Sequence, residues 1–256
     1  MRLLREIVFV FFISKFIKIK NNLSFTDLNF RRLDFTNYKQ IKLFIFKKNF
    51  YKLNNKYVHS FEFLNFSQSL GGKIGINLSR KSILDWYKIN RNKIGYPWNG
   101  DLSSKRLINI VYNYDFINSS STINETKILN KIIILHFNRI IFDYKNKKIS
   151  EISSYDLLAL VLLNLILKRD YEKNINFIDL IIDYQIDKLG MHKSYNIIDH
   201  AKFLNNIHEI KNIILYFDHK VSLKIEETIL KMTSILNEYF HTDGSIPLFN
   251  GSNNNY

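Results

Sequence analysis

Two long stretches of this sequence contain neither glycine nor proline, and they limit what the chain can fold into. The first covers residues 101–189 and the second covers residues 191–243. Glycine and proline are the residues that most often end or interrupt helices, so spans of this length without either predict one helix after another. We therefore predict an all-α fold beyond residue 100, in which short connections make consecutive helices antiparallel neighbours.

Capping patterns divide these stretches into individual helices. Thr122 with Glu125, and Ser153 with Asp156, match the capping box, in which the two side chains accept the first free backbone N–H groups of a helix. The helix after Ser153, SYDLLALVLLNLILK, is apolar nearly all round, which indicates burial on several sides. Further helices are expected to open near residues 101, 174, 194 and 222, the last ending near 241. The prediction is a stack of helical hairpins around a buried central helix.

The segment 178–217 predicts two amphipathic helices that meet at a tight corner. The first is expected to end near Leu189, because Gly190 can adopt the left-handed conformation that closes many helices. The second is expected to begin at Ser194, a favoured N-cap residue. The polar side chains at the corner are His192, Tyr195 and Asn196, with Gln185 one turn earlier. Two interpretations remain open: the corner lines a cleft, or it is only capped and solvated.

Residues 1–80 are less periodic, and we interpret them as a variable region packed on the body. The apolar run at 7–13 is far shorter than the roughly 20 residues that span a bilayer. We interpret it as a packed helix, with an uncleaved signal or a membrane-surface helix as alternatives. The glycines of LGGKIG, at 70–75, lack the pattern of a phosphate-binding loop, so we expect an ordinary loop there. Residues 81–250 then form one helical domain, and 251–256 a disordered tail.

Charge and composition narrow the choice of partners only partly. The chain carries a formal charge of +14 and has a pI near 9.6, which suits nucleic acid, anionic lipid or an acidic polysaccharide. It is also rich in Lys, Asn, Ile, Phe and Tyr, as expected from an AT-rich genome, so part of the charge needs no functional explanation. The absence of cysteine excludes disulfides and thiol chemistry. His, Asp and Glu show no metal-binding spacing, and we expect neither a metal nor another cofactor.

Three short blocks occur in a distinctive order: PWNGDLSSKRLIN from Pro97, QIDKLGMHKSYNI from Gln185, and a block from Asp243 to Asn250. They resemble R-R-L-x-x-W-L with its Trp-rich entry, Q-I-L-P-D-G-G-H-x-S-R-N-P and D-G-x-x-x-L-F-N, which occur in this order in the N-terminal helical half of the heparinase II/III-like polysaccharide lyases. In the second block Met191 replaces a glycine. The Asn-His pair of active relatives, at the start of a central helix, is replaced by Ser-Ser-Tyr-Asp from Ser153.

The resemblance implies an incomplete α/α toroid of antiparallel helical hairpins, which in complete relatives is followed by a β-sandwich domain. It also implies a lyase that cleaves uronate-containing acidic polysaccharides by β-elimination. In that reaction a base removes the proton on C5 once the sugar carboxylate has been neutralised. One alternative that stays open is that a separate chain supplies the sandwich domain. Without that domain, we expect weak glycan binding with little or no elimination.

The resemblance places the candidate catalytic residues in the block that starts at Gln185. They are His192, Tyr195 and Asn196, and Tyr195 is the expected base because of its chemical type and its place. The candidate substrate-binding residues are Gln185, His136, Arg139, Trp98 and His200. As alternatives, His136 and Arg139 form an ordinary polar helix face, and Trp98 anchors packing.

Two other functions remain open. The chain is alternatively a non-catalytic or truncated glycan-binding domain, or a basic helical module that binds nucleic acid or an anionic membrane. We expect an acidic polysaccharide rather than nucleic acid as the partner, and membrane binding stays open. The N-terminus shows no cleavage site for a secretory signal, so for a bacterial chain both the cytoplasm and the periplasm remain open.

Overall fold

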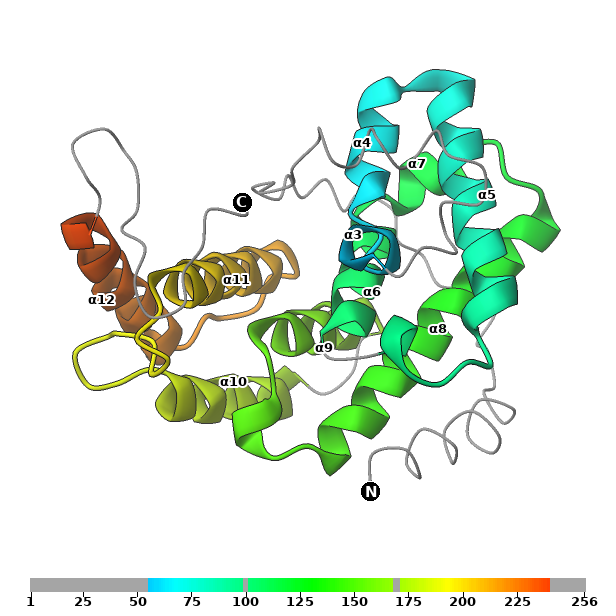
Figure 1. The fold of residues 1–256 in the computed structure, drawn as a ribbon. Helices are drawn as coiled ribbons and strands as arrows, with labels where there is room; N and C mark the ends of the chain where they lie inside the picture. Colours follow the sequence, from blue (N-terminus) through cyan, green and yellow to red (C-terminus); the bar gives the residue numbers. More distant parts are fainter. Residues whose placement is uncertain (1–54, 99–100, 168–170, 240–256) are drawn as a thin grey trace. The chain divides into compact units, whose positions relative to one another are not determined.

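The computed structural model describes residues 55–98, 101–167 and 171–239 of the chain (Figure 1). Regular structure within these ranges is helical, apart from one isolated β-bridge between Ile186 and His192. This confirms the all-α class predicted from the stretches without glycine and proline. The apolar run at 7–13, the block at 243–250 and the tail at 251–256 lie outside the described residues.

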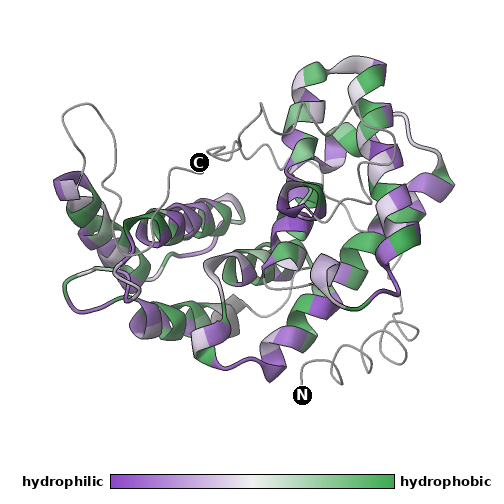
Figure 2. Ribbon diagram, viewed as in Figure 1, coloured by the Kyte–Doolittle hydropathy of each residue, from purple (hydrophilic) through white to green (hydrophobic). Residues whose placement is uncertain are grey.

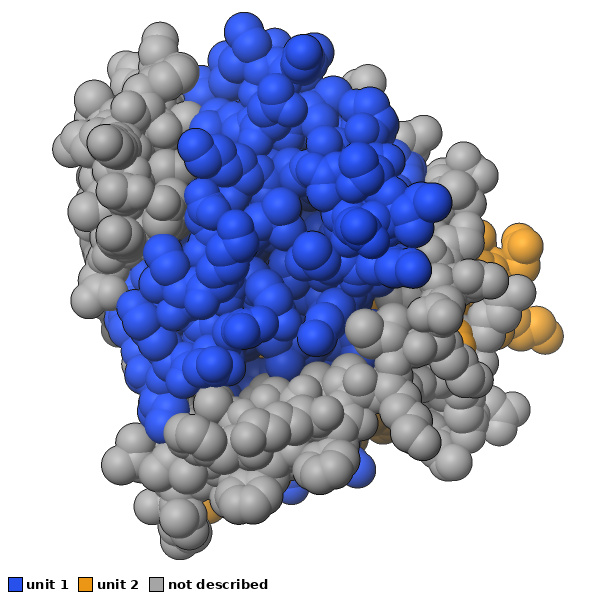
Figure 3. Space-filling view, turned by 90° about the vertical axis from the view of Figure 1, so that its right-hand side faces the viewer, with its two compact units in different colours: residues 1–31, 36–145 blue, residues 32–35, 146–256 orange. Residues whose placement is uncertain are grey.

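The chain divides into two compact units, which Figure 3 shows in different colours. Unit 1 contains the described residues up to Lys145, and unit 2 contains those from Asn146 onward. This division falls inside the 81–250 domain predicted from the sequence. The predicted boundary at residue 80 falls in the middle of a helix, α5 (Gly72–Asn90).

Helix α6 (Leu102–Tyr112) is the centre of unit 1. It packs against α3 (Lys56–His59), α4 (Phe63–Leu70), α7 (Tyr114–Asn118) and the 3₁₀-helix η3 (Tyr96–Trp98). Helix α5 packs on α4 and α7, and its Trp86 ring contacts the ring of His136 in the long helix α8 (Ile123–Asn146). Because partners cover it from several directions, α6 is buried over nearly its whole length.

The two predicted capping boxes form at helix starts. Thr122 Oγ1 accepts the N–H of Glu125 at 3.2 Å, and the Glu125 carboxylate accepts the N–H of Thr122 at 2.8 Å, just before α8. Ser153 and Asp156 make the same exchange at 3.1 and 3.2 Å before α9 (Ser154–Ile166). The sequence was sufficient here because both partners of each pair lie within one helical turn.

The glycine cluster at 70–75 is not the loop expected from the sequence. Gly71, with φ +65°, makes a one-residue turn between α4 and α5, and Gly75 lies within α5. A Cβ at Gly75 would lie only 2.2 Å from the carbonyl oxygen of Ser67 in α4. This glycine therefore lets two helices approach closely, a use that local sequence does not distinguish from a loop.

The described part of unit 2 contains four long helices: α9, α10 (Tyr171–Gln185), α11 (Ile197–Tyr216) and α12 (Leu223–Tyr239). Helix α9 packs against α10 and α11, and α12 packs against the same two, so the contacts close into a ring (Figure 1). A short 3₁₀-helix, η4 (Ile149–Glu151), precedes α9 and packs on α10. Figure 2 shows apolar and polar residues mixed along α10, α11 and α12, the pattern of helices with one buried face.

Helix α9 is buried on nearly all sides, as predicted from its sequence. Every residue from Asp156 to Leu163 is buried, and a run of more than two helical turns covers all directions around the helix. Leu158, Val161, Leu162 and Leu165, which share one face, are at most 3% exposed. In the part of the chain that the structure describes, no helix combines the length and the apolar character that crossing a bilayer requires.

Candidate functional site

The segment between α10 and α11 is an ordered loop, residues 186–196, rather than a tight corner. Helix α10 ends at Gln185, one turn before the predicted end at Leu189. The cause is Asp187, whose Oδ1 accepts the backbone N–H groups of residues 189, 190 and 191 at 3.0, 2.9 and 2.8 Å. These bonds fold the chain back into an Asx-type turn, which competes with a further turn of helix.

Close packing holds this loop on α12. The backbone N–H of Asp187 donates to the carbonyl of Met191 at 2.9 Å, which closes the turn. Gly190 has φ +100°, and a Cβ at this position would lie 2.6 Å from Cβ of Lys231 in α12. The left-handed conformation expected of Gly190 is confirmed, but it serves the loop and its contact with α12 instead of closing α10.

His192 is partly buried in the loop, and its hydrogen bonds define its protonation. Its Nδ1 accepts the backbone N–H of Ser194 at 3.2 Å and lies 2.8 Å from the Ser194 hydroxyl. Nδ1 is therefore the unprotonated nitrogen, and Nε2 carries the proton. Burial lowers the pKa of His192, Asp199 raises it, and His200 lowers it further. The ring is thus a neutral N–H donor near neutral pH.

Tyr195 is the most exposed of the candidate catalytic residues and has an unusual backbone conformation. It is 54% exposed and has φ +51°. Left-handed backbone costs roughly 1–2 kcal/mol in a residue other than glycine, so the surrounding loop must hold it in place. The N–H of Tyr195 donates to the carbonyl of His192 at 2.8 Å, which is one such restraint. Phe61, Ser120 and Asp218 also have positive φ, so this conformation by itself does not distinguish Tyr195 as functional.

Asn196, not Ser194, is the N-cap of α11. Its Oδ1 accepts the backbone N–H of Ile198 at 2.9 Å and that of Asp199 at 3.2 Å. The predicted start at Ser194 was wrong by half a turn, because serine and asparagine are equally favoured caps. Ser194 Oγ instead accepts the N–H of Asn196 at 3.2 Å. The side-chain oxygen of Asn196 is therefore occupied in holding the start of the helix.

Gln185 and His200 lie on the two helices that flank the loop, and both bind backbone groups. Gln185 Nε2 donates to the carbonyl of Ile152 at 2.5 Å. His200 is fully buried; its Nδ1 accepts the N–H of His192 at 3.3 Å, and its Nε2 lies 2.9 Å from the carbonyl of Met232. His200 therefore does not present its ring to a substrate, and its influence on one would pass through the loop.

A fully buried guanidinium, that of Arg106 on α6, organises the interior of unit 1. Its Nε donates to His136 Nε2 at 2.6 Å, and its Cζ lies 3.9 Å from the ring centroid of Trp86 and 4.9 Å from that of Trp98. Its Nη1 donates to the carbonyls of residues 59 and 97. His136 Nδ1 lies 2.7 Å from the carbonyl of Ile132 and therefore carries the proton. Burial and the charge of Arg106 hold the pKa of His136 well below its ordinary value.

The candidates His136, Arg139 and Trp98 thus lie together in unit 1, inside the fold. They are 0%, 2% and 3% exposed, respectively. Arg139 pairs with Asp143 at 2.9 Å, and the indole N–H of Trp98 donates to the carbonyl of Asn90 at 2.9 Å. These contacts favour the interpretation of Trp98 as a packing anchor. Sequence reasoning missed the part played by Arg106, whose one local signal is a basic residue in an apolar helix stripe.

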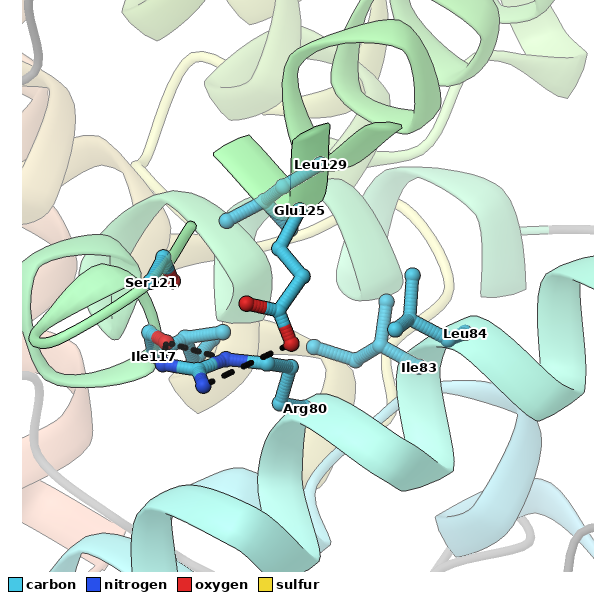
Figure 4. A pocket seen from close by; sticks show the side chains of 7 residues that line it. All are labelled: Arg80, Ile83, Leu84, Ile117, Ser121, Glu125 and Leu129. Atoms are coloured by element: carbon cyan, nitrogen blue, oxygen red, sulfur yellow. Dashed lines mark hydrogen bonds and ion pairs between the residues drawn. The ribbon is translucent and has the colours of Figure 1, made fainter. Parts of the chain in front are cut away.

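A small pocket in unit 1 lies beside the guanidinium of Arg80 (Figure 4). Its other lining residues are Ile83, Leu84, Ile117, Ser121, Glu125 and Leu129. Arg80 Nη2 donates to the carbonyls of residues 117 and 119 at 3.0 and 2.7 Å, at the end of α7. The free volume of about 10 Å³ is about the minimum for one water molecule. We therefore interpret Arg80 as a C-terminal cap of α7, because its guanidinium binds carbonyls at the end of that helix.

Within residues 55–98, 101–167 and 171–239, no group of three or more His, Cys, Asp or Glu side chains could hold a metal ion. Comparison of the chain with protein-family models, with curated proteins and with solved structures finds no match. The candidate site therefore rests on the loop 186–196. It brings together His192, Tyr195 and Asn196, with Gln185 and His200 on the helices at its two ends.

Proposed function

We propose that this chain is the helical part of a heparinase II/III-like polysaccharide lyase and that its loop 186–196 recognises a uronate-containing acidic polysaccharide. An α/α-toroid arrangement of the hairpins is part of this proposal. Its support is the order of the sequence blocks, together with the ordered loop into which the second block folds. The observation that carries it is Tyr195, an exposed phenol held at φ +51° three residues after the partly buried His192.

In this proposal the loop supplies a base and a neutral hydrogen-bond donor. Ionised Tyr195 takes the proton from C5 of the uronate, the C–H electron pair forms the C4–C5 double bond, and the bond from C4 to the glycosidic oxygen breaks. That oxygen then receives a proton from the phenol. The Nε2–H of His192 donates to the sugar carboxylate, whose charge otherwise makes the C5 proton a poor acid. Asn196 contributes by holding the loop at the start of α11.

The chain by itself is proposed to bind weakly and to eliminate little or nothing. A free tyrosine ionises near pH ~10, so a tyrosine base needs a cation beside it. His192 does not provide one near neutral pH, because burial lowers its pKa. Lys193 in the loop donates to the carbonyl of Asp183 at 2.9 Å and lies over the ring of Tyr184. A β-sandwich domain, such as the one that follows the helical half in complete relatives, is the proposed source of the missing cation.

The test measures binding and elimination with alginate, polygalacturonate and hyaluronan. Calorimetry follows binding, and the ultraviolet absorbance of the unsaturated product follows elimination. His192→Ala is expected to weaken binding about three- to tenfold, the factor that corresponds to one net hydrogen bond. Tyr195→Phe is expected to leave binding intact and to remove any residual elimination.

Matched controls are His208→Ala and Tyr184→Phe, which change exposed residues of the same types on α11 and α10. Both controls are expected to behave like the parent chain. Equal binding and turnover in the parent, His192→Ala and Tyr195→Phe would show that the loop is not the site. Preferential binding of DNA or of anionic vesicles over every uronate polymer would overturn the proposal in favour of a basic binding module.

A further inference from the structure

We propose that His200 is a positioning residue, which sets the loop 186–196 by tying it to α12. This inference rests on the proposed function, because it takes the loop as the ligand-binding element. His200 lies in the first turn of α11 and is 0% exposed. It touches no solvent, so its effect on a ligand is transmitted through the groups that its ring holds.

The two ring nitrogens of His200 hold two different parts of unit 2. Nδ1 accepts the backbone N–H of His192 from the loop at 3.3 Å, and Nε2 lies 2.9 Å from the carbonyl oxygen of Met232 in α12. A backbone N–H can only donate and a carbonyl can only accept, so the ring is neutral and its proton is on Nε2. His200 is therefore a bridge with two distinct ends: an acceptor for the loop and a donor to the helix.

This bridge fixes the position of His192. The His192 ring packs on Phe203 of α11 with the centroids 5.6 Å apart, and Ser194 fixes the role of its Nδ1. With the backbone N–H of the same residue anchored on His200, both the place and the rotation of the ring are determined. The Nε2–H of His192 is thereby held in one orientation, the pre-organisation that reduces the entropy cost of binding.

Other contacts keep the loop in place when the bridge is cut. Gly190 packs against Lys231 of α12, and Asp187 holds the three backbone N–H groups that follow it. Loss of the His200 contact should therefore loosen the loop around His192 without unfolding unit 2. Because the loop loosens while unit 2 stays folded, the effect of His200 on the loop can be measured.

Two substitutions separate the ends of the bridge. The side-chain oxygen of His200→Asn reaches the place of Nδ1 and can accept the N–H of His192, whereas the amide nitrogen of His200→Gln reaches the place of Nε2 and can donate to Met232. Both replace a buried ring by an amide, so the packing that they lose is similar. His208→Asn, at an exposed site on the same helix, is the matched control.

The first readout is the deuterium exchange rate of the His192 amide, measured by NMR together with the thermal unfolding midpoint. We expect His200→Gln to speed this exchange about three- to tenfold, as for one net hydrogen bond, and His200→Asn to change it less than about twofold. The second readout is affinity for the uronate polymer that the parent binds, which should fall only in His200→Gln. Equal acceleration in both variants, or none in either, would overturn the positioning role.

The exchange measurement needs no ligand, so the two proposals fail separately. If His200→Gln alone speeds exchange while the parent binds no uronate polymer, the proposed function fails and the hold of His200 on the loop stands. If His200→Gln speeds exchange of the His192 amide but leaves the affinity for the uronate polymer unchanged, the positioning of the ligand site by His200 is overturned. If both variants unfold, the imidazole ¹⁵N shifts of His200 in the parent chain test the bridge instead, because they show which ring nitrogen carries the proton. A proton on Nδ1 would refute the bridge.

Discussion

Aromatic rings and neutral acceptors surround the buried guanidinium of Arg106. Burying a charge is costly unless it is well hydrogen-bonded, and here it is met by His136, two carbonyls and the faces of two tryptophans. His136 can take part only as a neutral ring, because its Nε2 accepts from Arg106. A proton on Nε2 would place a second donor against the guanidinium, with Arg139 as a further nearby charge.

The free energy of unfolding of unit 1 is predicted to fall below about pH 6.5. Burial and Arg106 hold the pKa of His136 well below its ordinary value of 6.5. Below that pH the unfolded chain therefore takes up a proton that the folded unit does not. The stability is independent of this group above about pH 6.5 and falls by up to about 1.4 kcal/mol per pH unit below it, until the folded-state pKa is reached.

Urea titrations at a series of pH values measure this dependence. His136→Gln keeps an oxygen that can accept from Arg106 but has no titrating ring, so its stability should depend less on pH in that interval. His219→Gln, at an exposed site, is the control and should keep the parental dependence. Identical pH profiles for the parent and His136→Gln would contradict the prediction.

At the scale of single helices, the sequence predicted the helix starts that have a capping signal, but it did not predict the loop 186–196. The capping boxes at Thr122 and Ser153 form as expected, because all their partners are close in sequence. Asp187 and Asn196 each moved a helix end, since their side chains bind backbone N–H groups in competition with the helix. The local sequence around Arg106 could not predict its contact to a histidine 30 residues away.

Helix α9 gives the sharpest stability prediction at this scale. Leu162 is 0% exposed, and Leu162→Ala should lower the free energy of unfolding by about 2–5 kcal/mol through lost burial and a new cavity. Leu230→Ala on α12, where the side chain is 71% exposed, should change it by no more than about 0.5 kcal/mol. Denaturant unfolding measures both. A Leu162→Ala protein as stable as the parent would show that α9 is not tightly packed.

At the scale of the whole chain, the division between the units had no signal in the sequence. Domain boundaries usually show as Gly, Pro or polar linkers, whereas the boundary after Lys145 lies in a stretch without either breaker. Helix α8 runs up to it, ending at Asn146, and η4 begins three residues later. The absence of breakers that predicted the helices therefore also concealed where one unit ends and the next begins.

The placement of the tryptophans gives unit 1 a spectroscopic signature of its own. The chain has two tryptophans, Trp86 and Trp98, and both belong to unit 1, with ring centroids 5.4 Å apart. Indole fluorescence, excited where tyrosine does not absorb, therefore reports on unit 1 alone, while far-ultraviolet circular dichroism reports on the helices of both units. In a denaturant titration, coincident curves would mean that the units unfold as one. An indole transition displaced from the helical one would mean that each unit melts with a stability of its own.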